Sequence, residues 1–473
     1  MSSLEWLSFA ASGLATLLEV WAVIDLLRRP REPRAMIAWL LVLVLLPVVG
    51  LVAYALIGRL RVERARRRRH TRRTPRDPPA AAPHGDRRLD PALGALLHLA
   101  LRLTGFPATR DNDVTIFHDA EKTYLALQLA IESARHHVHV EYYIFQADET
   151  GRAVAELLMK KARDGVRCRV LLDDLGCWRM PRSLVRAWRA AGVEVAFFLP
   201  VIPWSGRWHV NLRNHRKIVV VDGAVGFTGS QNIGDEYRGR LKRYAPWRDT
   251  HLRIVGPAVH QLQDVFCDDW LFAAGSDPRG AELYPPPRST GDQLVHVIPS
   301  GPDSDAHVLT TLLFAAVGAA RSSICITSPY FVPDDAMLLA LRSAAYRGVR
   351  VQLLIPARSD SRLVLWAGRS YYDELCAAGV EVYEYDAGML HSKVVVVDQS
   401  WALAGSANMD TRSFRLNFEI TTVLYDPAPA RLLQADFDAL RDRSRRVHPL
   451  SPRDWRFRES LKLGLARLAS PLL

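Results

Sequence analysis

Two copies of one polar motif contain the residue types best suited to chemistry in this chain. Each copy has the pattern HxKxxxxD, and the six residues are His215, Lys217, Asp222, His391, Lys393 and Asp398. Residues i and i+2 of a strand point to the same face, so each His and its Lys project together. One imidazole can attack phosphorus while the other moves protons for the leaving and entering alcohols. The pattern therefore predicts group transfer at a phosphodiester.

A small glycine-centred element follows each motif, with the sequence GSQN in one copy and GSAN in the other. Ser and Asn side chains can donate hydrogen bonds to phosphate oxygens, and the lysines can stabilise charge that builds on them. The candidate phosphate-binding residues are Ser230, Asn232, Ser406 and Asn408. This chemistry requires no metal or cofactor, and the sequence contains no HExxH or GxxxxGK[ST] pattern.

The two aspartates of the motifs have a structural alternative to catalysis. Asp222 and Asp398 each begin a turn directly after an apolar run. A carboxylate at the end of a strand commonly accepts hydrogen bonds from backbone amides or pairs with a nearby base. We therefore expect both to stabilise the turn, although they belong to the candidate catalytic motif.

The motifs lie inside a wider internal duplication. Residues 215–232 (HRKIVVVDGAVGFTGSQN) match residues 391–408 (HSKVVVVDQSWALAGSAN) at a constant offset of 176 positions. Residues 162–172 (ARDGVRCRVLL) likewise resemble residues 345–355 (AYRGVRVQLLI). A short motif arises easily by chance, but two copies within a duplication do not. We expect two similar domains related by a pseudo-twofold axis, with one site at their interface.

The elements that must position the motifs are α/β in character. Short β-rich runs at 138–143, 166–172, 193–199 and 218–221 alternate with helical periodicity at 122–134 and 151–163. Such alternation indicates an α/β fold with a buried sheet. The five cysteines are scattered without a CxxC pair, which favours reduced, buried thiols and, weakly, a cytoplasmic body.

The net charge of +12 is concentrated near the N-terminus. Residues 59–88 hold twelve arginines and three acidic residues, and residues 28–34 hold four arginines and one glutamate, so these two stretches account for the whole excess. A nucleic-acid-binding body would carry clustered Lys and Arg on its folded surface. Basic residues beside apolar segments instead favour an anionic membrane surface, and we expect no nucleic-acid partner.

Two apolar segments predict a membrane anchor. Residues 35–57 contain no charge and are long enough to cross about 30 Å of hydrocarbon, although Pro47 can kink a helix there. Residues 4–27 include Glu5, Glu19 and Asp25, so a second span, an interfacial helix and half of a hairpin all stay open. The arginine cluster 66–69 favours a body on the cytoplasmic side of the cell membrane, whereas the shorter basic loop 28–34 favours the opposite side if both segments span; we give the denser cluster more weight.

These features predict four regions. Residues 1–60 form a membrane anchor with one or two transmembrane helices, and residues 61–109 form a basic linker rich in Pro, Ala and Arg, in which an amphipathic stretch at 91–104 can dock on the body. Residues 110–285 and 286–473 form the two duplicated domains.

The sequence resembles the phospholipase D superfamily and, more closely, the bacterial cardiolipin synthases. Beyond the two motifs, the resemblance rests on the blocks VEYYIF (140–145), WRDTHLRIVGPAV (247–259), SPYFVPDDAMLLAL (328–341) and GSANMDTRSFRLNFE (405–419), and on the terminal SPLL. It implies a metal-independent mechanism through a phosphohistidine. By this resemblance His215 is the nucleophile and His391 the general acid and base, or the reverse. It also implies an acidic residue behind each histidine, which we expect to be Asp249 for His215 and Glu419 for His391.

The resemblance further implies the substrates. One phosphatidylglycerol would transfer its phosphatidyl group to the enzyme and release glycerol, and a second would accept it to give cardiolipin. Phosphatidylethanolamine could replace one donor without a visible change in the motifs. A hydrolase of the same fold that releases phosphatidic acid, a membrane-tethered nuclease and a non-catalytic scaffold are the alternatives. The neutral charge of the body disfavours the nuclease, and the intact motifs disfavour the scaffold. Acyl-chain preference and oligomeric state stay open.

Overall fold

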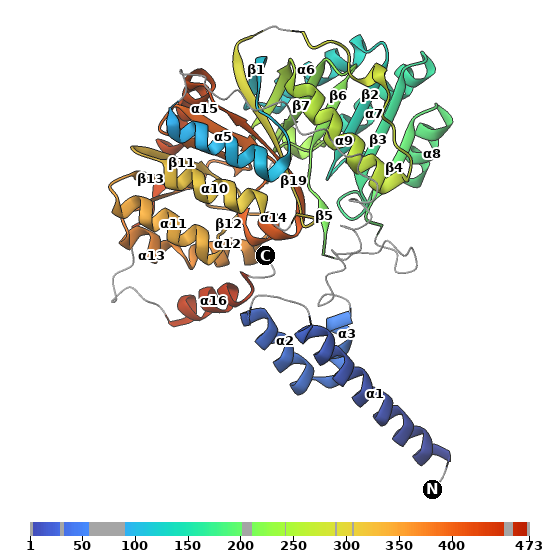
Figure 1. Cartoon of the computed structure of the whole chain (residues 1–473), viewed down its shortest axis with the longest axis vertical. Helices are drawn as coiled ribbons and strands as arrows, with labels where there is room; N and C mark the ends of the chain where they lie inside the picture. Colours follow the sequence, from blue (N-terminus) through green and yellow to red (C-terminus); the bar gives the residue numbers. More distant parts are fainter. Residues whose placement is uncertain are drawn as a thin grey trace.

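A computed structural model describes residues 3–28, 33–55, 90–200, 211–241, 243–288, 291–304, 307–448 and 457–470. One sheet of 16 strands forms the centre of the body, and helices cover both of its faces (Figure 1). The predicted α/β class is therefore confirmed. The basic stretch 59–88 lies outside the described residues.

The sheet consists of two halves with the same strand order. The outer-to-inner order in the first half is β4(Glu194–Phe198), β3(Arg167–Asp173), β2(His137–Tyr142), β6(Ile218–Val221), β7(Val225–Gly229), β9(His251–Val255) and β1(Thr109–Phe117). The second half continues with β10(Gln293–Ser300), β19(Asn417–Leu424), β17(Trp401–Gly405), β16(Val394–Val397), β11(Ser323–Thr327), β13(Arg350–Pro356) and β14(Glu381–Tyr385), and ends at β20(Arg445–Arg446). Reading outward from the β1–β10 junction gives corresponding strands on the two sides. Because β1 and β10 pair antiparallel, this order has the pseudo-twofold symmetry that the duplication predicts.

Short strands lie beside the motifs. These are β5(Arg213–Asn214), β8(Trp247–Arg248), β12(Phe331–Val332), β15(Met389–Leu390) and β18(Met409–Asp410). Strand β5 of the first half pairs with β19 of the second, and β15 of the second half pairs with β8 of the first. The sequence immediately before each motif histidine is thus hydrogen-bonded to the opposite half.

The helices of the body follow the duplication as well. The first half contains α6(Ala120–Ser133), α7(Glu149–Arg163), α8(Arg182–Ala190), η3(Asp235–Arg238), α9(Ala258–Ala274) and η4(Ala281–Leu283). The second contains α10(Val308–Ala319), α11(Asp335–Tyr346), α12(Arg362–Arg369), α13(Tyr372–Ala377), α14(Thr411–Arg415), α15(Pro427–Arg441) and α16(Phe457–Leu468). Apolar side chains of α9 and α15 share one core with strands of both halves, so the two units are packed as one body.

The amphipathic stretch within the predicted linker forms α5(Pro91–Thr104) and packs on the second half. Asp90 caps its N-terminus by accepting from the Ala92 amide at 2.9 Å. Leu96, Leu97 and Ala100 are buried in the core that also contains α10 and α11. This helix thus joins the N-terminal region to the body.

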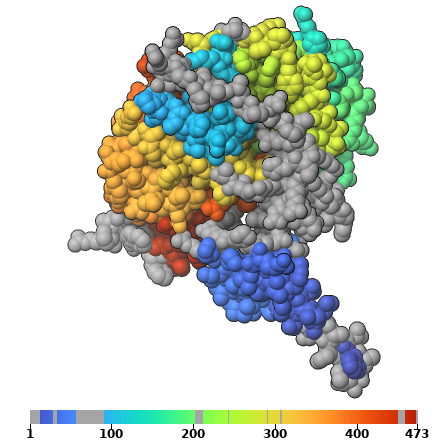
Figure 2. All heavy atoms as spheres, in the orientation of Figure 1, coloured from blue at the N-terminus to red at the C-terminus, as the bar shows by residue number. Residues whose placement is uncertain are grey.

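The N-terminal region forms α1(Ser3–Leu27), α2(Pro33–Leu45) and α3(Pro47–Ala53), which project from the body (Figures 1 and 2). Ala22, Leu26, Leu43 and Tyr54 form a small buried core between them. The apolar run at 35–57 is divided into two helices just before Pro47, whose ring and missing amide hydrogen break helical hydrogen bonding. Across the described ranges given above, no helix combines the length and apolar character that a bilayer crossing requires. The predicted spans 4–27 and 35–57 are therefore not confirmed.

Candidate active site

The two motif histidines meet in one cavity, as the duplication predicts. His215 follows β5 and His391 follows β15, and each is 8% exposed. Both line a cavity of about 400 Å³ between the two halves. The buried valines of β6 and β16 follow Lys217 and Lys393 and anchor each motif in the sheet. The remaining lining residues are Tyr143, Ile144, Arg213, Asn232, Glu236, Tyr237, Tyr244, Trp247, Tyr330, Asp360, Val364, Asn408, Asp410, Arg412 and Asn417.

A carboxylate from the opposite half holds each histidine. The Nδ1 atom of His215 lies 2.9 Å from Oε2 of Glu419, and Nδ1 of His391 lies 2.9 Å from Oδ2 of Asp249. The expected acidic residues are therefore correct, but the expected pairing of Asp249 with His215 and Glu419 with His391 is wrong.

The cross-pairing follows from the strand register. The amide of His215 donates to the carbonyl of Phe418 at 2.9 Å, which places Glu419 beside the His215 ring. The amide of His391 donates to the carbonyl of Arg248 at 2.7 Å, which places Asp249 beside the His391 ring. Each carboxylate thus accepts from Nδ1 and leaves Nε2 as the nitrogen for chemistry.

The two serines predicted to bind phosphate lie behind the carboxylates instead. Ser230 Oγ donates to Asp249, Ser406 Oγ donates to Glu419, and both serines are fully buried. Gly229 makes this placement possible, because its φ of 143° and the carbonyl of Thr250 leave no room for a side chain. The predicted phosphate-binding role of Ser230 and Ser406 is therefore wrong, and these hydroxyls fix the carboxylates.

The two asparagines occupy the positions expected of ligand-binding groups. Asn232 and Asn408 both line the cavity. The Asn232 amide is oriented by a hydrogen bond from its Nδ2 to Tyr237 Oη at 3.2 Å. The backbone amide of Asn408 donates to Ser413 Oγ at 3.1 Å. Both side chains thus line the cavity that also contains the two histidines.

The motif lysines are buried directly beneath the histidines. Lys217 Nζ donates to the carbonyl of His215 at 2.6 Å, and Lys393 Nζ donates to the carbonyl of His391 at 2.8 Å. Lys393 Nζ also lies 3.1 Å from His391 Nε2. Burial lowers the pKa of Lys217 to about 7 and of Lys393 to about 8, while the nearby carboxylates oppose this shift. The two lysines are thus poised to titrate near neutral pH.

Burial favours the neutral form of both histidines. Burial lowers the pKa of His215 to about 4, against the attraction of Glu419, and burial also lowers the pKa of His391. Burial alone would raise the pKa of Glu419, but the adjacent His215 and Lys217 hold it at about 2. A neutral imidazole beside an ionised carboxylate has a free lone pair on Nε2, as a nucleophile or base requires.

The motif aspartates stabilise turns outside the cavity, as expected. Asp222 accepts from the amides of Arg135, His136 and His137 at 2.8–2.9 Å. Asp398 accepts from the amides of Arg321, Ser322 and Ser323 at 2.7–2.9 Å. Each carboxylate therefore fixes the start of the strand beside its motif, and neither lines the cavity.

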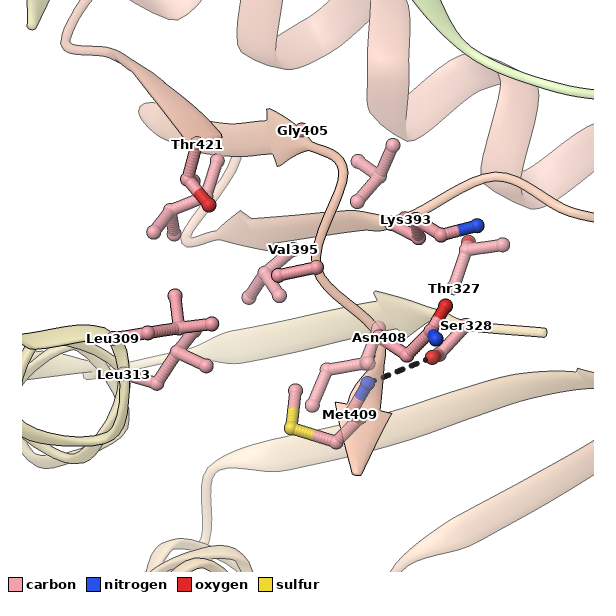
Figure 3. Close-up of a pocket in the computed structure, with 14 residues that line it drawn as sticks. Leu309, Leu313, Thr327, Ser328, Lys393, Val395, Gly405, Asn408, Met409 and Thr421 are labelled. Carbon is pink, nitrogen blue, oxygen red and sulfur yellow. Dashed lines mark hydrogen bonds between the residues drawn. The ribbon is translucent and has the colours of Figure 1, made fainter. Parts of the chain in front are cut away.

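A small apolar pocket backs the second motif. It has a volume of about 30 Å³ and lies between α10 and the strands behind Lys393 and Asn408. Figure 3 shows Leu309 and Leu313 on the opposite side of this pocket from Lys393. The Met409 amide donates to Ser328 Oγ at 3.0 Å beside it (Figure 3). The pocket belongs to the packing that supports the site.

Several cavity residues were missed by sequence reasoning. Arg213, Glu236, Asp360 and Arg412 line the cavity with charged side chains. Arg213 could have been found from the sequence, because it lies two positions before His215 and so shares the same face of an extended chain. Glu236 lies on η3, Arg412 on α14 and Asp360 between β13 and α12, and no motif in the sequence marks these positions. Among the described residues, no group of three or more His, Cys, Asp or Glu side chains is arranged to hold a metal ion.

Comparison with known proteins gives a consistent result. The family model described as "Cardiolipin synthase, PLD-like domain" matches residues 127–269 and 313–441, which contain both histidines and both partner carboxylates. A second model, "Phospholipase_D-nuclease N-terminal", matches residues 17–59. A cardiolipin synthase of Geobacillus thermodenitrificans is 44% identical over 384 residues, covering 80% of this chain and 76% of that protein. One from Halalkalibacterium halodurans is 41% identical over 383 residues, with the same coverage.

The solved structures show a similar fold. The crystal structure of a phosphatidylserine synthase from Haemophilus influenzae matches with a TM-score of 0.62 and 14% identity, covering 80% of this chain and 100% of that one. At this identity the match concerns the fold alone.

Proposed function

The chain belongs to the cardiolipin synthase family of phospholipase D-like phosphatidyltransferases, and we propose that it transfers a phosphatidyl group from one phosphatidylglycerol to another, giving cardiolipin and glycerol. One observation supports this reaction most strongly. Two histidines from separate halves face one cavity, and each has its Nδ1 held by a carboxylate at 2.9 Å. Such a pair supplies a nucleophile on one side of a phosphorus atom and a proton donor on the other.

In the first half-reaction, Nε2 of His215 attacks the phosphorus and the bond to the glycerol oxygen breaks. His391 gives a proton to that oxygen, and glycerol leaves. The Nζ atom of Lys393 lies 3.1 Å from His391 Nε2. The lysine can therefore supply His391 with the proton that it passes to glycerol. An anionic phosphodiester in the cavity also raises the pKa of His391 and so makes its protonated form available.

In the second half-reaction, a hydroxyl of another phosphatidylglycerol loses its proton to His391. Its oxygen attacks the phosphorus, and the bond between phosphorus and His215 breaks. The lysines and the amides of Asn232 and Asn408 bind the nonbridging oxygens in both steps. Both lysines donate to the carbonyl of their own histidine, and Lys393 also lies 3.1 Å from Nε2 of His391. This additional contact suits proton transfer by His391, so His215 is favoured as the nucleophile.

We further propose that residues 1–60 attach the enzyme to the cell membrane, with residues 61–109 as the connection and the duplicated domains 110–285 and 286–473 on the cytoplasmic side. Helices α1–α3 support this placement, because Leu17, Leu45 and Val48 are each about 70% exposed. The basic stretch 59–88 would attract anionic lipids such as phosphatidylglycerol.

A product assay tests the reaction. Purified full-length protein in phosphatidylglycerol liposomes, with a chelator present, should release about one glycerol for each cardiolipin formed. Phosphatidic acid and glycerol without cardiolipin would instead identify a hydrolase on the same scaffold.

A further inference from the structure

The two motifs differ at the position between their histidine and their lysine. This residue is Arg216 in the first copy and Ser392 in the second, and both are buried. Successive residues of an extended chain point to opposite faces, so Arg216 lies behind His215 and does not line the cavity. The two halves therefore present the same reactive groups but support them differently.

Arg216 reaches from the first half into the second. Its Nε donates to the carbonyl of Glu419 at 3.0 Å, and its Nη2 donates to the carbonyl of Ser300 at 3.0 Å. These carbonyls belong to paired residues of β19 and β10. Its Nη1 donates to Asp269 of α9, in an ion pair whose side chains are at most 1% exposed. The guanidinium thus connects the first motif to α9 and to the strand that carries Glu419.

The first motif holds the backbone on both sides of the Glu419 side chain. The amide of His215 donates to the carbonyl of Phe418 at 2.9 Å, and Arg216 Nε holds the next carbonyl, which is that of Glu419 itself. The centre of the Arg216 guanidinium also lies 5.6 Å from the centroid of the Phe418 ring. Because both neighbouring peptide groups are fixed, the carboxylate is held 2.9 Å from Nδ1 of His215.

The residue before each histidine differs in the same way. Asn214 accepts from the amide of Arg216 at 3.1 Å through its Oδ1, and its Nδ2 donates to Glu141 at 2.6 Å. With the offset of 176, Asn214 corresponds to Leu390, whose side chain can make neither hydrogen bond. The buried polar network behind His215 therefore has no counterpart at this position of the second half.

The pair of His391 and Asp249 has a weaker support. The amide of His391 fixes the carbonyl of Arg248 at 2.7 Å, but Ser392 Oγ makes no hydrogen bond within the described part of the chain. The side chain of Arg248 donates to Asp436 at 2.6 Å and is 32% exposed. Water screens a partly exposed ion pair, so this contact constrains the backbone less than the buried contacts of Arg216 do.

From this asymmetry we propose that Arg216 is a positioning residue, which fixes Glu419 across the interface and so holds His215 in the orientation for attack on phosphorus. The inference rests on the proposed function for the role of His215 as the nucleophile. Attack requires Nε2 in line with the bond that breaks, so a fixed ring orientation increases the rate of the chemical step. Arg216 thereby gives two chemically similar histidines different degrees of support.

The double variant Arg216→Met, Asp269→Leu tests this role, because removing both members of a buried ion pair is tolerated better than removing one. Burial is the main cause of the raised pKa of Glu141, so this neighbouring carboxyl stays neutral in the double variant. The kcat should fall on the order of 10- to 100-fold, as for other lost outer hydrogen bonds. The KM should keep the wild-type value, since neither residue lines the cavity.

Two single variants accompany the double variant. Arg216→Lys keeps the charge opposite Asp269 but loses the planar fork that reaches two carbonyls, so its kcat should lie between those of the wild type and the double variant. Ser392→Ala changes the matched position of the other motif and should keep the wild-type kcat.

Proton NMR reports on each pair without any substrate. An imidazole Nδ1–H that is held by a carboxylate gives a resonance far downfield. Protein with isotope-labelled histidine should show one such resonance for each pair, assigned with His215→Ala and His391→Ala. The double variant should shift or broaden the resonance of His215 and leave that of His391 in place.

Wild-type kcat with both resonances unchanged in the folded double variant would overturn the positioning role. Loss of both resonances together would also overturn it, because that result indicates a general structural role. If the double variant does not fold, the same two measurements on Arg216→Lys decide. A wild-type enzyme that makes no cardiolipin would overturn the proposed function alone, since the NMR comparison needs no reaction.

Discussion

His215 and Glu419 are separated by 204 residues, yet Nδ1 of the histidine lies 2.9 Å from the carboxylate. The second pair, His391 and Asp249, crosses between the halves in the same way. Each half therefore supplies one reactive nitrogen and the carboxylate that orients the other. This arrangement makes the active site depend on the packing of the two halves.

Glu419→Gln is expected to slow formation of the phosphatidyl-enzyme on His215. The amide keeps the shape but cannot hold Nδ1–H as an ionised acceptor does, so kcat should fall on the order of 10²- to 10⁴-fold. A rapid-quench measurement of labelled enzyme would detect the change in the first step. Asp249→Asn provides the comparison, since it weakens proton transfer by His391 and should slow both the departure of glycerol in the first step and the attack of the acceptor hydroxyl in the second. If Glu419→Gln left the first step at the wild-type rate, the crossed pairing would have no catalytic role.

The serines behind the carboxylates give a separate prediction. Ser230→Ala and Ser406→Ala should each lower kcat by roughly tenfold, because the carboxylate loses an orienting hydrogen bond. The KM for phosphatidylglycerol should stay near the wild-type value, since neither hydroxyl reaches the cavity. Steady-state kinetics in mixed micelles separates these effects. A large rise in KM with unchanged kcat would restore the role of phosphate ligand that the sequence suggests.

The pH profile of kcat/KM follows from the buried lysines and histidines. His215 must be neutral to attack, so the rate should rise as pH increases through its pKa of about 4. Lys217 and Lys393 must be charged, so the rate should fall as pH increases through about 7 to 8. Lys217→Arg should move the alkaline limb upward, because the guanidinium stays protonated. A wild-type profile that still rises above about pH 9 would contradict this assignment.

Asp222→Ala is expected to affect folding stability without a direct effect on catalysis. The variant removes the acceptor for three backbone amides, which should lower the free energy of unfolding by about 1–3 kcal/mol. Urea denaturation measures this change, and Asp398→Ala serves as the equivalent variant in the other half. The KM of the folded fraction should equal that of the wild type. A raised KM with unchanged stability would indicate that Asp222 acts on the substrate.

Much of the fold could be predicted because both copies of the duplicated segment can be recognised directly in the sequence. The apolar runs after Lys217 and Lys393 identify β6 and β16, and the constant offset of 176 residues implies matched halves. The shared cavity follows, since a pseudo-twofold axis brings equivalent histidines together. The turn role of Asp222 was also predictable from its position at the end of an apolar run.

The pairing of histidines with carboxylates could not be predicted in the same way. It depends on β5 pairing with β19 and β15 pairing with β8, and such contacts between halves leave no periodic signal. The role of the serines could not be predicted for a related reason. The tight contact of Gly229 with the strand of Thr250 turns Ser230 towards Asp249. The single long helix expected over 35–57 is divided before Pro47, where the loss of the amide hydrogen outweighs uniform hydrophobicity.

Trapping the covalent intermediate tests the two-histidine mechanism most directly. His391→Ala and His215→Ala would each be mixed with phosphatidylglycerol labelled in its phosphate, quenched, and digested for peptide mapping. We predict that His391→Ala retains a slow burst of label on His215, that His215→Ala holds no label, and that neither variant turns over at an appreciable rate. Label on His391 in the His215→Ala variant, or near-normal turnover by both variants, would contradict the mechanism.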